Sequence, residues 1–144
     1  MLDIRPIDAT ISVAPQIAPE DIAAIKAAGF VAIVNNRPDD EEGGQPSGDA
    51  IRTAAEDAGL AYTAIPITHA GFSQAQVVAM SEALANANGP VLAFCRSGTR
   101  SCNLWALAQA SLGADRDELT AKGAGAGYNL TNLRPLMDAV AQQG

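Results

Sequence analysis

Six consecutive residues combine a thiol, two guanidinium groups and a glycine in an order that could do chemistry: Cys95, Arg96, Ser97, Gly98, Thr99 and Arg100. They follow the apolar run 90–94 and precede a helix-like segment, which predicts a strand, a tight turn and a helix. In such a turn, backbone N–H groups and the positive end of the helix dipole converge on one point. This field favours a thiolate over a thiol. Cys95 is therefore a candidate nucleophile, and Arg100, at the helix entry, is placed to bind an oxyanion.

The alternative for Cys95 is a small buried hydrophobe, which is the usual role of a lone cysteine at a strand end. The polar residues around it are poor core residues and favour the catalytic loop. Within that loop, Ser97, Gly98 and Thr99 are expected to bind the anion together with Arg96, whose charge faces the substrate side. Ser101 follows Arg100 and is expected to cap the helix and to hydrogen-bond the Cys95 sulfur.

The chain has 144 residues, which fits one domain spanning 1–144. With 48% hydrophobic but only 4% aromatic residues, the core is expected to consist of Ala, Val, Ile and Leu. A formal net charge of −7 argues against nucleic acid or an anionic membrane surface as a partner. The expected partner is a small anionic substrate, attracted by the loop itself; the composition leaves the oligomeric state open.

Two cysteines cannot form a disulfide framework, and no secretory signal or membrane span is visible in the sequence. A bacterial-type cytoplasmic enzyme is therefore expected. The single histidine and the scattered carboxylates have no recognisable ligand spacing, so neither a metal nor another cofactor is predicted.

The hydrophobic pattern and the helix-capping residues predict alternating strands and helices. Strands are expected at 10–14, 30–35, 60–67 and 90–95, and helices at 19–28, 47–58, 73–88, 101–112, 116–122 and 131–142. This alternation predicts an α/β fold with a mainly parallel sheet and helices on both faces. The strand before Cys95 should be central, with the site at the carboxyl ends of the strands, where residues 35–37 and 66–71 also arrive. The glycine-rich run 123–127 is expected to be a flexible surface connection.

Four segments, 30–35, 36–41, 65–67 and 89–105, resemble the phosphatase-like domain of the beta-lactamase hydrolase-like proteins. This bacterial family has a fold of the dual-specificity phosphatase type, and the resemblance covers about residues 5–112. It implies a four- to five-stranded sheet with helices on both faces and Cys95 as the nucleophile.

Two features depart from the phosphatase pattern. Tyrosine phosphatases carry a His before the Cys and an Arg six residues after it, whereas Phe94 precedes Cys95 here and Arg100 comes after only five residues. A loop of this shorter length resembles that of rhodaneses, which hold the terminal sulfur of a cysteine persulfide. Phosphatases also usually supply an acidic Asp from the loop after the strand at 60–67, where this chain has Thr68-His69-Ala70-Gly71. His69 is a candidate proton donor, with a plain polar loop residue as the alternative. Asp39 or Asp40 is the other candidate, although both also fit a solvated acidic turn.

Two further residues have alternative roles near the site. Arg37 either reaches the bound anion or pairs with the acids that follow it. Cys102 is either a packed, inert thiol or a resolving partner for an oxidised Cys95.

Three functions stay open at this point. The first is a phosphatase-like hydrolase that acts through a thiophosphate intermediate on Cys95. The second is a rhodanese-like sulfurtransferase with a Cys95 persulfide, for which no proton donor is needed. The third is a non-catalytic module that senses an anion or an oxidant.

Overall fold

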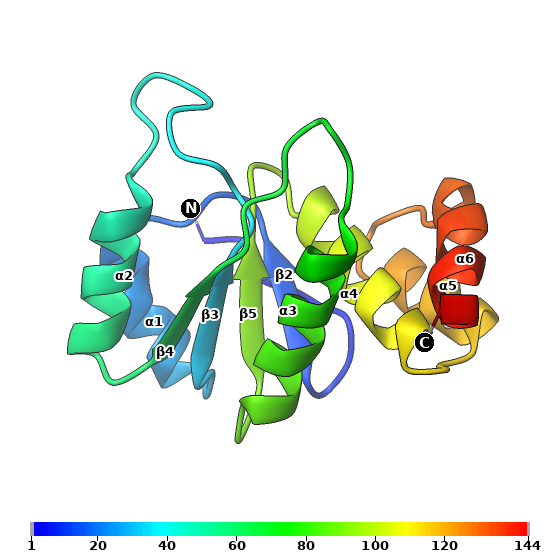
Figure 1. Cartoon of the computed structure of the whole chain (residues 1–144). Helices are drawn as coiled ribbons and strands as arrows, with labels where there is room; N and C mark the ends of the chain where they lie inside the picture. Colours follow the sequence, from blue (N-terminus) through cyan, green and yellow to red (C-terminus); the bar gives the residue numbers. More distant parts are fainter. Residues whose placement is uncertain (1, 144) are drawn as a thin grey trace.

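A five-stranded sheet forms the centre of the computed structural model, which describes residues 2–143 (Figure 1). Its strands are β1 (Arg5–Pro6), β2 (Ile11–Ala14), β3 (Ala32–Asn35), β4 (Ala61–Ala64) and β5 (Val91–Phe94). They lie in the order β1-β2-β5-β3-β4, and only β1 is antiparallel to its neighbour. The predicted mainly parallel sheet with a central strand before Cys95 is therefore confirmed. The short edge strand β1 was not predicted, because two residues give no alternating pattern.

Six α-helices and two short 3₁₀ turns join and cover the strands. The helices are α1 (Ile22–Ala27), α2 (Gly48–Asp57), α3 (Gln74–Asn86), α4 (Thr99–Ser111), α5 (Arg116–Gly125) and α6 (Arg134–Gln143), and the 3₁₀ turns are η1 (Pro19–Asp21) and η2 (Thr131–Leu133). Ser73 and Gln76 form the predicted capping box at the start of α3. Among the described residues, no helix combines the length and the apolar character needed to cross a membrane.

The two faces of the sheet carry separate apolar cores. On one face, α1 and α2 bring Ile25 and Ile51 against Ile33 and Phe94. The opposite face belongs to the second core, which includes Met80, Trp105, Val34 and Ala93 from α3, α4 and the strands. Every residue of β5 is buried, as expected for a parallel strand covered on both sides. Helices α5 and α6 pack on the side of α4 that faces away from the sheet (Figure 1).

The structure differs from the predicted elements by a few residues at several ends, and three differences bear on the site or its surroundings. Helix α4 begins at Thr99, two residues earlier than expected, because Gly98 provides the left-handed residue before it. Strand β4 ends at Ala64 and not at 67, since Pro66 has no N–H for the sheet. The expected flexible connection at 123–127 is wrong for residues 123–125, which continue helix α5.

The reason for this helical continuation is packing. Gly123 is buried, and a β-carbon there would lie 2.5 Å from Cδ1 of Leu130. The glycine therefore serves a close approach between α5 and the chain that follows it, and not flexibility.

Candidate active site

Cys95 lies directly after the central strand β5, with its side chain fully buried. The backbone N–H of Gly98 donates a hydrogen bond to Cys95 Sγ, with an N···S distance of 3.1 Å. Gly98 has φ +88° and is the residue before the first turn of α4. The thiol therefore sits under a turn amide and beside a helix N-terminus, the arrangement that stabilises negative charge on sulfur.

Gly98 meets two demands at once. Its left-handed backbone disfavours any residue with a β-carbon. A β-carbon would also overlap the hydroxyl oxygen of Tyr128, which lies against the back of the turn. The sequence pattern predicted a tight turn that contains this glycine, whereas the contact with Tyr128 depends on a residue that lies 30 positions further along the chain.

Arg100 lies in the first turn of α4, and its guanidinium group makes a two-pronged ion pair with Glu41. The Nη1–Oε2 distance is 2.7 Å and the Nη2–Oε1 distance is 2.9 Å. Nη1 also donates to the carbonyl of Ile67 at 2.7 Å, which ties the loop after β4 to the site. The hydrogen-bonded Glu41 carboxylate and the nearby Cys95 charge raise the pKa of Arg100, partly offset by burial. Arg100, which the sequence predicts to bind an oxyanion, thus holds a carboxylate of the protein.

Glu41 lies at the candidate site and was not predicted there from the sequence. Its Oε1 also accepts a hydrogen bond from Nε of Arg37 at 2.9 Å, so the carboxylate bridges two arginines. Hydrogen bonds from Arg100 and then Arg37 outweigh burial and lower the pKa of Glu41 to about 2. The only sequence signal was the spacing of four residues between Arg37 and Glu41.

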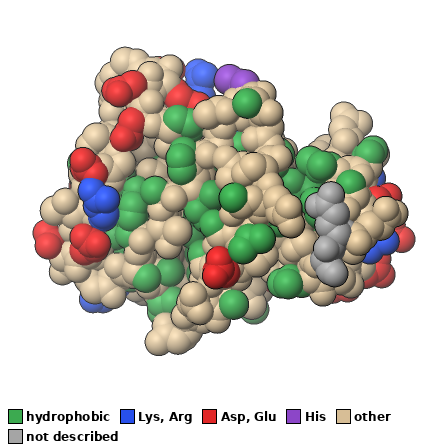
Figure 2. All heavy atoms as spheres, viewed as in Figure 1, with side chains coloured by type: hydrophobic (Ala, Val, Ile, Leu, Met, Phe, Trp, Pro, Cys, Tyr) green, Lys and Arg blue, Asp and Glu red, His purple; other side chains and the backbone are tan. Residues whose placement is uncertain are grey.

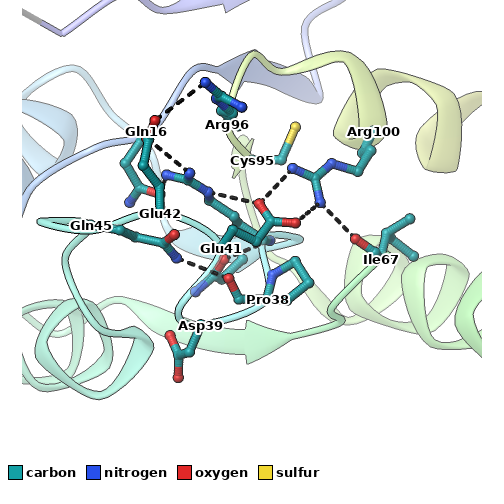
Figure 3. A network of polar contacts seen from close by, with 12 residues as sticks. Gln16, Pro38, Asp39, Glu41, Glu42, Gln45, Ile67, Cys95, Arg96 and Arg100 are labelled. Carbon is teal, nitrogen blue, oxygen red and sulfur yellow. Dashed lines mark hydrogen bonds and ion pairs between the residues drawn. The ribbon is translucent and has the colours of Figure 1, made fainter. Parts of the chain in front are cut away.

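Arg37 takes the second of its two predicted roles. Its side chain is only 2% exposed and pairs with the acids that follow it, Glu41 and Glu42. Its Nη1 donates to Oε1 of Gln16 at 3.0 Å. The Arg96 side chain is 66% exposed, and its Nη2 lies 3.3 Å from Oε2 of Glu42. Figure 3 shows Glu41, Glu42 and Arg96 on the same side of the Cys95 loop.

Ser101 is buried and links the start of α4 to the neighbouring strands. Its hydroxyl donates to Oδ1 of Asn36 at 2.8 Å, and Asn36 Nδ2 in turn donates to the carbonyl of Ile65 at 2.9 Å. Within the loop, the Ser97 hydroxyl donates to Oγ1 of Thr99 at 2.9 Å. The predicted cap at Ser101 is replaced by this cross-link, because α4 begins before it.

The two candidate proton donors lie in different places. Asp39 Oδ1 accepts a hydrogen bond from the backbone N–H of Gly48 at 2.7 Å, so the carboxylate engages the first turn of α2. In Figure 3, Asp39 points away from Cys95. His69 is exposed in the turn closed by the bridge between Thr68 and Gly71. Figure 2 shows the histidine at the upper edge of the molecule, beside a basic side chain.

Cys102 is fully buried on α4. Burial, followed by the charge on nearby Cys95, raises the pKa of Cys102 to about 12. Cys102 is therefore a thiol at neutral pH, as in the packed role predicted for it. Among the described residues, no group of three or more His, Cys, Asp or Glu side chains is arranged to hold a metal ion.

The strand order and the cysteine loop between β5 and α4 define a protein with the fold of the dual-specificity and tyrosine phosphatases. Tk-PTP in its active form superposes with a TM-score of 0.70 at 20% identity, covering 98% of this chain and 97% of its own. P. aeruginosa TpbA in complex with pTyr superposes with a TM-score of 0.65 at 16% identity, covering 97% of this chain and 88% of its own. These two likenesses concern the fold.

Residues 3–112 match the model of the phosphatase-like domain of the beta-lactamase hydrolase-like proteins, and the chain belongs to this family. A beta-lactamase hydrolase-like protein of Xylella fastidiosa is 42% identical over 103 residues, which is 71% of this chain. The chain spans about a quarter of that relative's length, since the match covers 24% of it. A Neisseria meningitidis structure described as a candidate phosphatase has a TM-score of 0.82 at 33% identity and covers 95% of this chain and 97% of its own. The predicted family and fold are thus confirmed.

Proposed function

We propose that this phosphatase-like domain is a cysteine-dependent hydrolase of phosphate esters with Cys95 as the nucleophile. The proposal rests above all on the hydrogen bond from Gly98 N–H to Cys95 Sγ at the start of α4. A hydrogen-bond donor and a helix dipole aimed at sulfur stabilise the attacking thiolate. Family membership and the phosphotyrosine complex of TpbA support a phosphorylated substrate.

The reaction has two steps. In the first, Cys95 Sγ attacks phosphorus, the S–P bond forms and the P–O bond to the leaving alcohol or phenol breaks. In the second, water attacks phosphorus, the S–P bond breaks and inorganic phosphate leaves with Cys95 restored as a thiolate. The amides of residues 96–100 and the Arg100 guanidinium stabilise the equatorial oxygens in both steps.

The leaving oxygen needs a proton, and His69 is the favoured donor. It is exposed two residues after Ile67, whose carbonyl contacts Arg100. Asp39 is less suited to this role because its carboxylate accepts the Gly48 hydrogen bond at the start of α2. A positioned acid contributes about 10² to 10⁴ in rate.

A rhodanese-like sulfur transfer is the second candidate, favoured by the short spacing and by Glu41. Only four residues separate Cys95 from Arg100, and both terminal nitrogens of Arg100 already bind the Glu41 carboxylate. A single sulfur atom added to Cys95 therefore needs less additional space than a tetrahedral phosphoryl group. In that reaction the S–S bond of thiosulfate breaks, a new S–S bond forms on Cys95 and sulfite leaves with the electron pair.

One experiment separates these functions. The purified protein is incubated with para-nitrophenyl phosphate, and separately with thiosulfate followed by intact mass spectrometry. Cys95→Ser is the test variant, and Cys102→Ala, which changes the other buried thiol, is the control. We expect phosphate release that is abolished in Cys95→Ser and retained in Cys102→Ala.

Other results would change the assignment. A Cys95-dependent gain of one sulfur without phosphate release would make the chain a sulfurtransferase. The absence of both reactions would leave the anion- or redox-sensing module as the function.

A further inference from the structure

The peptide unit between Ser97 and Gly98 makes hydrogen bonds at both of its ends. Its carbonyl, on Ser97, accepts from the Tyr128 hydroxyl with an O···O distance of 2.9 Å. Its N–H, on Gly98, donates to Cys95 Sγ at 3.1 Å. Because the C=O and N–H of one trans peptide point in opposite directions, the contact on one side fixes the direction of the other. Tyr128 and the Cys95 sulfur are thus joined through a single rigid group.

Tyr128 is itself held firmly. The residue is only 7% exposed, and its backbone N–H donates to the carbonyl of Gly123 at 2.9 Å, which fixes it at the end of α5. The guanidinium group of Arg5 lies 5.4 Å from the centre of its ring. A β-carbon on Gly98 would overlap the Tyr128 hydroxyl, so the phenol and the turn are in close contact. The Tyr128 hydroxyl is therefore held in a fixed position behind the Cys95 loop.

We propose that Tyr128 is a positioning residue for the Cys95 nucleophile: its hydroxyl orients and polarises the Ser97–Gly98 peptide so that the Gly98 N–H stabilises the thiolate. A hydrogen bond to a peptide carbonyl strengthens the donor at the other end of the same unit. The inference rests on the proposed function for its catalytic meaning, but the thiolate itself is measurable without a substrate. Tyr128 lies beyond residues 3–112, so it extends the site past the segment that the family model matches.

The titratable groups near Cys95 come from several elements. Arg100 and Cys102 interact with it from α4, and Tyr128 does so from the segment after α5. Glu41 reaches Arg100 from the loop after β3. Tyr128→Phe removes only the hydroxyl and substitutes none of these other groups.

The test compares Tyr128→Phe with Tyr62→Phe, the same change at the other tyrosine of the chain. The Tyr62 hydroxyl accepts from Asn35 and donates to the carbonyl of Gly48, away from the Cys95 loop. The thiolate of Cys95 is followed by ultraviolet absorbance from about pH 4 to about pH 9, with Cys95→Ser as the baseline. Burial raises the pKa of both tyrosines, and the pKa of Cys102 is about 12, so these groups stay protonated in this window.

We expect the midpoint of the Cys95 transition to rise by roughly half a pH unit or more in Tyr128→Phe, because the variant loses the hydrogen bond to the Ser97 carbonyl. In Tyr62→Phe the midpoint should equal that of the unaltered protein. An unchanged midpoint in folded Tyr128→Phe, or the absence of any Cys95 transition in the unaltered protein, would overturn the inference. A shifted midpoint in a protein that releases no phosphate would overturn the proposed function and leave the inference intact.

Discussion

The two sides of the Cys95 loop are built from different kinds of interaction. The inner wall, formed by Asn36, Cys95, Gly98, Ser101 and Tyr128, is buried and joined by hydrogen bonds without ion pairs. The outer rim, formed by Arg37, Glu41, Glu42, Arg96 and Arg100, is a chain of ion pairs that ranges from buried to well exposed.

The inner hydrogen bonds fix the shape of the loop, whereas the outer ion pairs are ones that an anion can exchange. Buried hydrogen bonds fix the direction of the loop amides, because each lost partner leaves a buried polar group unsatisfied. Ion pairs near solvent are individually weak, so a substrate anion can replace a carboxylate at modest cost. The inner wall therefore determines where the sulfur and amides lie, and under the proposed function the outer rim determines which anion reaches them.

The largest effect is expected from Arg100→Lys in the outer rim. Lysine keeps the positive charge but loses the planar fork that binds two oxygens at once, so kcat/KM for para-nitrophenyl phosphate should fall by about 10²-fold. Arg116→Lys is the matched control, since Arg116 pairs with Asp138 on the far helices. Equal activity in Arg100→Lys and the unaltered protein would show that charge alone suffices at the rim.

The next effect is expected from Gly98→Ala in the inner wall, measured by urea unfolding. We expect a loss of about 2 to 4 kcal/mol, because alanine adds left-handed strain and a collision with the Tyr128 hydroxyl. Gly113→Ala is the control: φ is +92° there and no heavy atom lies within 4 Å of the added carbon, so only about 1 kcal/mol of strain applies.

A double variant separates the steric contact with Tyr128 from the backbone strain. Adding Tyr128→Phe to Gly98→Ala removes the hydroxyl oxygen, so part of the lost stability should return, although the ring carbon Cζ stays 3.0 Å from the alanine carbon. If the two alanine variants were equally unstable, contact with Tyr128 would not be what constrains the turn.

The smallest effect is expected from Glu41→Gln, measured as a difference in stability across pH. The pKa of Glu41 is about 2 in the folded protein, below its ordinary value of 4.5. Since the folded value is depressed, its ion pairs stabilise the protein above pH 4.5, and this contribution is lost as pH falls from 4.5 towards 2. The difference between the unaltered protein and Glu41→Gln should be about 1 kcal/mol at pH 6 and vanish towards pH 2.

The Glu41→Gln variant also tests whether an anion can replace the Glu41 carboxylate in the outer rim. With the competing carboxylate neutralised, inorganic phosphate should inhibit Glu41→Gln at a several-fold lower concentration. Glu118→Gln is the control, because Glu118 pairs with Lys122 on α5. Weaker phosphate binding in Glu41→Gln would mean that Glu41 holds Arg100 in place for the substrate and does not compete with it.

Local patterns were enough to predict most of the fold. The alternation of apolar runs with capped helices gave the parallel sheet, and the Ser73 and Gln76 cap marked the start of α3. The prediction of a flexible connection at 123–127 was wrong for residues 123–125, because glycine can serve either flexibility or close packing and the two look alike in a sequence. Only the position of Leu130 against Gly123 distinguishes them.

The sequence by itself determined the make-up of the loop: a cysteine after a buried strand, a glycine for the turn and an arginine at the helix start are local, because one strand, one turn and one helix suffice to place them. Only the tertiary structure decided what surrounds that loop. Glu41 on Arg100, Asn36 on Ser101 and Tyr128 behind Gly98 join residues 30 to 65 positions apart. Such contacts depend on the order of the strands and on the packing of α5 against α4, for which the spacing of residues along the chain contains no signal.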